Sequence, residues 1–118
     1  MNFPSATYRV QLNNNFTFKD LKKIIPYLHK LGISTIYAAP ITQSTSGSNH
    51  GYDVIDPHTV NPEIGTEEEL SRIASKLKSL EMNWLQDIVP NHMAFSTANT
   101  RLMDVLERGP HSPYYRYF

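Results

Sequence analysis

Three runs of β-forming residues alternate with two amphipathic segments along the chain. The runs cover residues 7–12, 33–39 and 83–89, and the segments at residues 18–31 and 66–80 carry apolar side chains at helical spacing. Strands that alternate with helices of this length join into parallel β-α units. The sequence therefore predicts an α/β fold whose strands form a parallel sheet.

The two expected helices carry capping signals at their starts. Thr17 with Asp20, and Thr66 with Glu69, have the spacing of a capping box, in which each side chain bonds the backbone N–H of the other residue. Pro26 lies inside the first helical segment, where it lacks the N–H that the helix ladder needs. We therefore expect a kink at this residue or a break directly before it.

The connection between the second and third strands is unusually long. Residues 41–65 are rich in Ser, Thr, Asn, Gly and Pro, and so long a loop without regular structure is uncommon unless it has a function. After a short helical stretch at residues 102–107, an aromatic tail at residues 114–118 needs a partner to pack against. We expect the 118 residues to be the N-terminal piece of a larger domain. Uncovered strand edges in such a piece favour self-association.

The composition of the chain argues against several classes of protein. Eleven basic and eleven acidic residues give no net charge, which argues against a nucleic-acid partner. The chain has no cysteine and no run near the ~18 apolar residues of a membrane span, and residues 1–5 have neither the basic nor the apolar region typical of a secretory leader. Its histidines show no metal-ligand spacing, and the first strand is not followed by the phosphate loop of a flavodoxin-like fold. We expect a cytoplasmic protein without a membrane segment, metal or cofactor.

The first candidate site is the sequence His50-Gly51-Tyr52-Asp53 in the long connection. Tyr52 offers an aromatic face that can stack on a sugar ring, and Asp53 can accept hydrogen bonds from neighbouring sugar hydroxyls. The alternative is a plain turn, with the tyrosine anchored in the core and the aspartate capping a backbone amide. Both interpretations fit these four residues.

The second candidate site runs from Asp87 to His92, where an apolar run ends in Pro90-Asn91-His92. A buried parallel strand that opens into a polar site has this pattern, and α/β barrels carry their active sites at such strand ends. His92 can hydrogen-bond a substrate hydroxyl, Asn91 can do the same or bind a cation, and Asp87 can brace the site. The alternative is a strand-ending turn with a buried aspartate.

Together these motifs resemble the alpha-amylase superfamily of glycoside hydrolases, and within it the N-terminus of the maltooligosyl trehalose synthases. The resemblance rests on residues 4–12, 50–54, 87–93 and 104–114, in that order. It implies that residues 1–118 are the N-terminal part of an incomplete (β/α)8 TIM barrel, since a complete one takes roughly 250 residues. The chain would hold the first three strands, two crossover helices and a long loop after the second strand.

The resemblance also implies which residues bind the substrate. Tyr52 matches the aromatic residue that stacks on the sugar preceding the scissile bond. Asp53 and His92 match residues that approach the hydroxyls of that sugar. Asn91 matches a residue that binds structural calcium in many amylases, but the synthases are not known as calcium enzymes. We therefore assign Asn91 to substrate binding and expect no metal.

Asp87 and His50 are expected to support the site. The reaction of this family converts the reducing-end α-1,4 linkage of a maltooligosaccharide into an α,α-1,1 (trehalose) linkage, by retaining intramolecular transglycosylation on two carboxylates. The resemblance places these carboxylates after later strands, and none of their motifs occurs before Phe118. We therefore expect the chain to supply part of a sugar-binding wall and to be inactive alone.

Two alternatives stay open. The chain can be a fragment of another α-1,4-glucan hydrolase or transferase of the same superfamily, since the region from Asp87 to His92 alone does not separate these enzymes. It can also be a non-catalytic α-glucan-binding module, which needs a fold that is closed without further strands.

Overall fold

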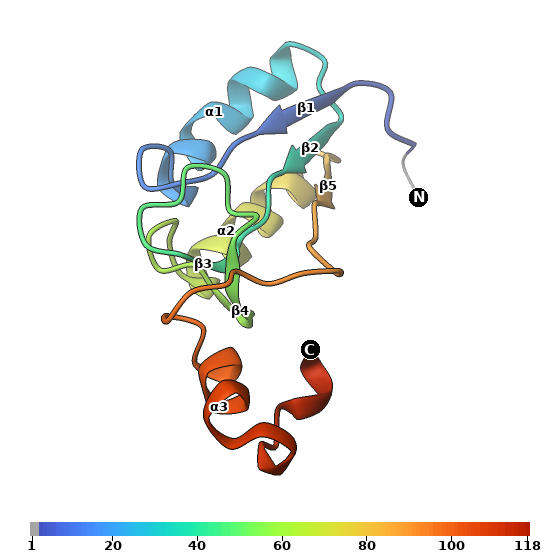
Figure 1. The fold of residues 1–118 in the computed structure, drawn as a ribbon. Helices are drawn as coiled ribbons and strands as arrows, with labels where there is room; N and C mark the ends of the chain where they lie inside the picture. The colour runs from blue at the N-terminus through green and yellow to red at the C-terminus, as the bar shows by residue number, and fades with distance from the viewer. Residues whose placement is uncertain (1–2) are drawn as a thin grey trace.

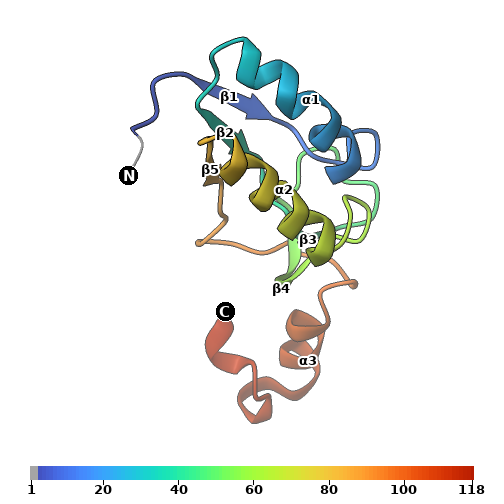
Figure 2. The same cartoon turned by 180° about the vertical axis from the view of Figure 1, so that it is seen from behind.

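The computed structural model describes residues 3–118 of the chain. Its centre is a parallel sheet in the order β1-β2-β5, made of β1 (Thr7–Val10), β2 (Thr35–Ala38) and β5 (Asn83–Gln86). Helix α1 (Phe18–Lys30) joins β1 to β2, and helix α2 (Glu67–Ser79) leads into β5. Both helices cover the same face of the sheet (Figure 1, and from behind in Figure 2). The predicted α/β fold is confirmed.

The core lies between this face of the sheet and the two helices. Every second strand residue points toward the helices, and each helix turns one apolar stripe toward the strands. Burial of an aliphatic or aromatic side chain of this kind contributes about 1.5–3 kcal/mol. The buried core residues, which come from β1, β2, α1 and α2, are Val10, Ile36, Ala38, Phe18, Leu21, Ile25, Leu28, Ile73 and Leu77, and Trp84 of β5 packs against them.

Both predicted capping signals are present at the helix starts. Before α1, the Asp20 carboxylate accepts a hydrogen bond from the Thr17 backbone N–H at 3.1 Å. Before α2 the bonds are reciprocal: Glu69 accepts from the Thr66 N–H at 3.1 Å, and the Thr66 hydroxyl accepts from the Glu69 N–H at 3.2 Å. These contacts satisfy backbone donors that the first turn of a helix leaves unpaired.

Of the kink or break expected at Pro26, the break does not occur, because α1 runs through this residue in one piece. Pro26 lies on the exposed side of the helix. The carbonyl of Lys22, which loses its N–H partner to the proline, can therefore bond water. On the other side of the helix Ile25 and Leu28 are buried against the sheet. This packing outweighs the missing hydrogen bond.

The expected long loop at residues 41–65 contains an antiparallel hairpin, which the sequence did not predict. Strand β3 (Thr42–Ser44) pairs with β4 (Val54–Val60), with irregular register along β3. Pro57 lies inside β4, and a proline argues against a strand because it cannot donate to the ladder. It is tolerated here because it lies at an exposed position of a two-stranded sheet. The hairpin carries residues 45–53 between its strands.

Strand β5 is shorter and more exposed than predicted. It ends at Gln86, and the side chains of Leu85 and Ile88 are 52% and 67% exposed. The apolar sequence predicts a strand that is buried on both faces. Within residues 3–118, however, β5 pairs on one side only, with β2, and the helices cover only one face. Neither β2 nor the two helices cover these side chains.

Residues 94–118 extend away from the sheet and its helices (Figure 1). Helix α3 (Thr100–Arg108), predicted at residues 102–107, is followed by two short 3-10 helices at Gly109–His111 and Tyr115–Tyr117. Arg101 ties α3 to β4 through an ion pair with Asp56, with 3.0 Å between Nη1 and Oδ1. No helix within residues 3–118 has the length and apolar character to cross a membrane.

Candidate functional site

The two candidate segments meet at the carboxyl end of the parallel sheet. Asp87 directly follows β5, and its backbone N–H donates to the carbonyl of Ala38, the last residue of β2, at 3.0 Å. Tyr52 comes from the connection that precedes β4, yet its hydroxyl donates to the Asp87 carboxylate at 2.5 Å. The structure therefore brings together two residues that lie 35 positions apart in the sequence.

Two further residues complete this cluster. The guanidinium of Arg9, on β1, donates from Nη2 to the Tyr52 hydroxyl oxygen at 2.8 Å. The hydroxyl of Tyr37, on β2, donates to the same Asp87 oxygen at 3.1 Å. We call Arg9, Tyr37, Tyr52 and Asp87 the strand-end cluster. It links all three parallel strands to the connection before β4.

Hydrogen bonds within the strand-end cluster shift the pKa values of two of its residues. The hydrogen bond to Asp87, together with burial, raises the pKa of the Tyr52 phenol above its ordinary value. The hydrogen bond to Tyr52 raises the pKa of the Arg9 guanidinium. Tyr52 therefore stays neutral and Arg9 stays charged across the physiological pH range.

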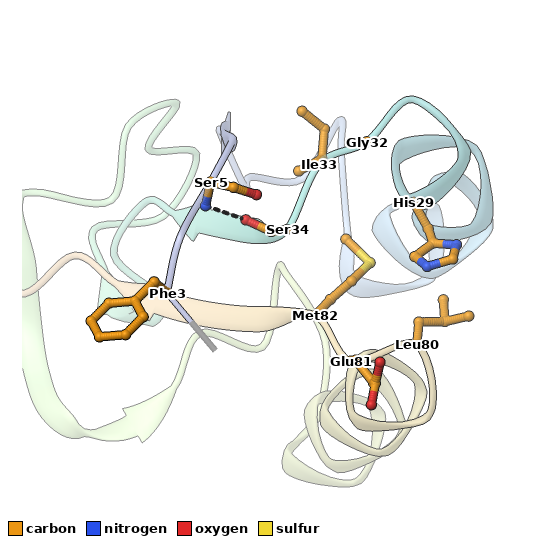
Figure 3. Close-up of a pocket in the computed structure, with 9 residues that line it drawn as sticks. All are labelled: Phe3, Ser5, His29, Gly32, Ile33, Ser34, Leu80, Glu81 and Met82. Atoms are coloured by element: carbon orange, nitrogen blue, oxygen red, sulfur yellow. Dashed lines mark hydrogen bonds between the residues drawn. The ribbon is translucent and has the colours of Figure 1, made fainter. Parts of the chain in front are cut away.

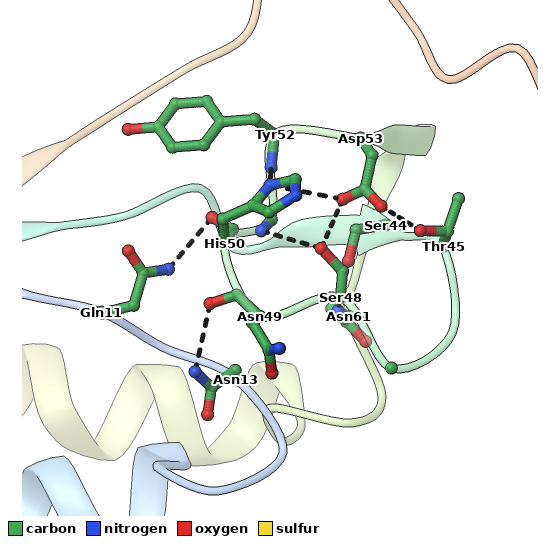
Figure 4. Close-up of polar contacts among 12 residues, drawn as sticks. Gln11, Asn13, Ser44, Thr45, Ser48, Asn49, His50, Tyr52, Asp53 and Asn61 are labelled. Atoms are coloured by element: carbon green, nitrogen blue, oxygen red, sulfur yellow. Dashed lines mark hydrogen bonds and ion pairs between the residues drawn. The ribbon is translucent and has the colours of Figure 1, made fainter.

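Hydrogen bonds to two backbone carbonyls hold the connection before β4 against the segment that follows β1. Gln11 donates from Nε2 to the carbonyl of His50 at 3.0 Å, and Asn13 donates from Nδ2 to the carbonyl of Asn49 at 3.2 Å (Figure 4). Gly51 has φ +78°, and a Cβ at this position would lie 2.7 Å from the carbonyl oxygen of Pro40. Only glycine allows this approach, so residues 49–52 are held tightly against the end of β2.

Asp53 is held by side chains of its own connection. The hydroxyl of Thr45 donates to Oδ2 and that of Ser48 donates to Oδ1 (Figure 4). Burial acts to raise the pKa of Asp53, but these hydrogen bonds outweigh it and leave the pKa below its ordinary value. Asp53 is therefore an anion that organises the connection, and the spare lone pairs of its oxygens are what it can offer a ligand.

His92 and Asn91 lie beside Tyr52 and are exposed. The Nε2 of His92 lies 3.1 Å from the carbonyl oxygen of Tyr52, and because a carbonyl only accepts, Nε2 carries the proton. The other ring nitrogen, Nδ1, lies 3.0 Å from Oδ1 of Asn91. His50 is exposed too, and its ring stacks beside that of Tyr52 with 6.1 Å between the centroids. All six residues predicted for the site thus lie in one region.

The sequence did not single out Arg9, Tyr37 or the two hydroxyl residues that hold Asp53. A signal for the first two was present in the strand pattern. Arg9 and Tyr37 occupy paired positions on β1 and β2, with their side chains on the face opposite to the buried Val10 and Ile36. Polar side chains at paired positions near strand ends indicate a polar cluster on that face.

Two hollows flank the carboxyl end of the sheet. One, of about 200 Å³, includes Asp87 and Pro90 in its wall, and the other, of about 520 Å³, includes Asn91, His92 and Tyr117. A third pocket, of about 580 Å³, lies at the amino-terminal end of the sheet and contains none of the predicted residues (Figure 3). In the described part of the chain, no three His, Asp or Glu side chains are grouped so that they could hold a metal ion.

Comparison with known proteins identifies the family. The family model for the alpha amylase catalytic domain matches residues 9–118. A putative maltooligosyl trehalose synthase of Mycobacterium tuberculosis is 40% identical over the whole chain, which covers 16% of that protein. The solved maltooligosyltrehalose synthase from Arthrobacter ramosus is 43% identical with a TM-score of 0.93, over 98% of this chain and 16% of that one. The solved structure of a hypothetical maltooligosyl trehalose synthase of Sulfolobus tokodaii is 44% identical with a TM-score of 0.91. The match covers 100% of this chain and 16% of that one.

These findings confirm the resemblance to maltooligosyl trehalose synthases that the sequence motifs indicated. The chain spans 16% of the length of the relatives that it matches. With the family model matched over nearly all of its residues, the chain belongs to the alpha-amylase family.

Proposed function

We propose that residues 1–118 form the N-terminal part of a (β/α)8 barrel in an enzyme of the maltooligosyl trehalose synthase type. The three parallel strands and the helices on one face fit the first β-α units of such a barrel. The open face, which carries Arg9, Tyr37 and Leu85 at paired positions, would become the barrel interior. The partly exposed β5 would then pair with a following strand.

The strand-end cluster is the observation that carries this proposal. It collects polar groups at the carboxyl ends of parallel strands, which is where barrel enzymes bind their substrates. We assign substrate binding to Tyr52, Asp53, Asn91 and His92, with the Tyr52 ring stacking on a glucosyl unit. Asp87 and His50 support these residues, Asp87 through its bond to the Tyr52 hydroxyl.

The whole protein is proposed to act on maltooligosaccharides or related α-glucans in the cytoplasm. It converts the reducing-end α-1,4 linkage into an α,α-1,1 linkage and so forms a trehalose end, by retaining intramolecular transglycosylation. We assign no catalytic carboxylate to residues 1–118, which contribute part of the sugar-binding wall. The 118-residue chain alone is therefore proposed to leave the substrate unchanged and, with its open sheet face, to self-associate.

The test is to express the complete open reading frame that encodes these residues and to incubate the product with maltopentaose. An intramolecular transfer removes the reducing end but leaves the mass of the saccharide unchanged, which reducing-sugar assay and mass spectrometry measure together. Shorter saccharides with additional reducing ends would show a hydrolase of the same superfamily. Binding without any change in the saccharide would show a non-catalytic α-glucan-binding module.

A further inference from the structure

The hydroxyl of Tyr52 is fully engaged within the protein. It donates its single proton to Asp87, whose carboxylate can only accept, at 2.5 Å. Its oxygen accepts a hydrogen bond from Nη2 of Arg9 at 2.8 Å. A charge-assisted bond on either side holds this hydroxyl in the sheet end. What Tyr52 has left for a ligand is the face of its ring.

Arg9 is itself fixed on three sides. Its guanidinium lies over the Tyr37 ring, with 5.4 Å between Cζ and the ring centroid, and Nη1 donates to Oε1 of Gln11 at 3.2 Å. Nη2 is 3.9 Å from the Asp87 oxygen, which is too long for a hydrogen bond. Arg9 and Asp87 thus form a direct ion pair, but the hydrogen bonds between them run through the Tyr52 hydroxyl.

The backbone of Tyr52 is anchored separately from its hydroxyl. His92 donates from Nε2 to the Tyr52 carbonyl oxygen at 3.1 Å, and the neighbouring Gly51 packs on the backbone of Pro40. The ring thus has one end held by His92 and Gly51 and the other end held by Arg9 and Asp87. An aromatic residue that is fixed at both ends presents its face in one orientation, which reduces the entropy lost when a sugar stacks on it.

We propose that Arg9 is a positioning residue of the sugar site, which acts through the Tyr52 hydroxyl to fix the plane of the ring against which a glucosyl unit stacks. The proposal rests on the function proposed above and deepens it. In this proposal Tyr52 contacts the sugar only through the face of its ring, while its hydroxyl bonds only Arg9 and Asp87. Loss of Arg9 removes one of the two bonds that fix the outer end of the ring, which Asp87 alone then holds less firmly.

The test is a double-mutant cycle with Arg9→Met and Tyr52→Phe in the whole protein, with maltopentaose as the substrate. A hydrogen bond to a charged group corresponds to about tenfold in an equilibrium or rate constant, so each single variant should lower kcat/KM about tenfold. Because both act on the same hydroxyl, the double variant should also lose about tenfold, and not the ~100-fold of independent effects. The decrease should lie in kcat more than in KM, since ring orientation matters most at the reacting sugar.

Arg72→Met is the matched control, because Arg72 is an exposed arginine of α2 whose ion pair joins it to Glu68 within the same helix. It should leave kcat/KM unchanged. Thermal unfolding of all variants, followed by circular dichroism, establishes that each is folded at the assay temperature. Arg9→Lys provides the second variant: it keeps the charge but lacks the planar fork, so its kcat should stay low.

Losses that multiply in the double variant would overturn the role of Arg9, because Arg9 would then act independently of the Tyr52 hydroxyl. Full activity of Arg9→Lys would overturn it too, since charge alone would suffice. The wild-type protein separates this failure from that of the proposed function. An inactive wild type contradicts the function itself, whereas an active wild type with multiplicative losses contradicts only the positioning role.

Discussion

The two faces of the parallel sheet have opposite chemistry although the same short strands form both. The face toward α1 and α2 carries Val10, Ile36 and Ala38, all buried. The other face carries Arg9, at a position paired with Tyr37 and through it with Leu85, and these side chains are exposed or half-buried. Because side chains alternate between the two faces of a strand, each short sequence contributes to both faces. One set of residues forms the core, and the other includes Arg9 and Tyr37 of the strand-end cluster.

The largest effect is expected from the helix-covered face. Ile36→Ala removes a fully buried side chain from the centre of β2 and leaves a cavity between sheet and helices. It should lower the free energy of unfolding by about 3 kcal/mol, which urea unfolding measures. Leu85→Ala, on the open face of β5, is the matched variant. In the monomeric 118-residue chain, where nothing covers this face and Leu85 is 52% exposed, it should cost less than about 1 kcal/mol.

Equal losses from the two variants would contradict the division between the faces. They would mean that the open face is covered in solution. Sedimentation at the same protein concentrations would then show whether a second copy of the chain covers it.

The second largest loss of stability is expected where Gly51 packs closely against Pro40, at the end of β2. Gly51→Ala forces a Cβ to within 2.7 Å of the Pro40 carbonyl oxygen at φ +78°. Gly47→Ala is the matched control, since Gly47 has φ +74° but nothing within 4 Å of its Cβ position. The left-handed conformation alone costs about 1 kcal/mol, so Gly47→Ala should lose that much in urea unfolding and Gly51→Ala at least about 2 kcal/mol. Similar losses would show that the connection can shift away from β2 without cost.

A smaller effect, of opposite sign, is expected on the helix-covered side. Pro26→Ala restores a backbone donor for the carbonyl of Lys22 in a helix that already runs through this position. It should stabilise the protein by about 1 kcal/mol, since the recovered hydrogen bond exceeds the entropy that proline removes from the unfolded chain. Thermal unfolding measures the gain. A loss of stability would instead show that the proline ring itself contributes packing to α1.

The helices and the parallel strands could be predicted because one periodic signal determines each of them. Apolar residues such as Ile25 and Leu28 recur at helical spacing, and the caps at Thr17 and Thr66 mark where each helix begins. The hairpin formed by β3 and β4 could not be predicted, since Pro57 and irregular pairing hide it. The exposure of β5 was missed for a different reason: burial depends on what lies beside a strand, and the strand's own sequence does not contain that information.

The site was predicted in part. Asp87 could be named because it lies where a strand ends, and the carboxyl ends of parallel strands converge. Tyr52 could be named from its motif in the long connection. Their direct contact, and the bond from Arg9 to Tyr52 across 43 positions, are properties of the tertiary structure. The hydrogen-bond partners of Asp53 could not be predicted from the sequence. One of its oxygens accepts a bond from Thr45 and the other accepts a bond from Ser48. The binding of sugar by these residues stays a prediction that the saccharide assays test.

The smallest effect is expected from the charge that organises the site on the open side. The folded-state pKa of Asp53 lies below its ordinary value of 3.8, because the hydroxyls of Ser48 and Thr45 outweigh the effect of burial. The unfolded chain therefore binds the proton more readily than the folded chain. The stability that Asp53 contributes is complete above its unfolded pKa and is lost as the pH falls from there through the folded pKa.

Urea unfolding of the wild type and of Asp53→Asn across this acidic range measures that contribution. The variant cannot titrate at this position, so its stability should fall less steeply with decreasing pH than that of the wild type. Two other carboxylates with lowered pKa values, Asp20 before α1 and Asp56 beside Arg101, stay in both proteins and account for the slope that remains. Parallel curves would show that Asp53 has the same pKa in the folded and unfolded chain. In that case its hydroxyl partners would serve to shape the connection and not to stabilise its charge.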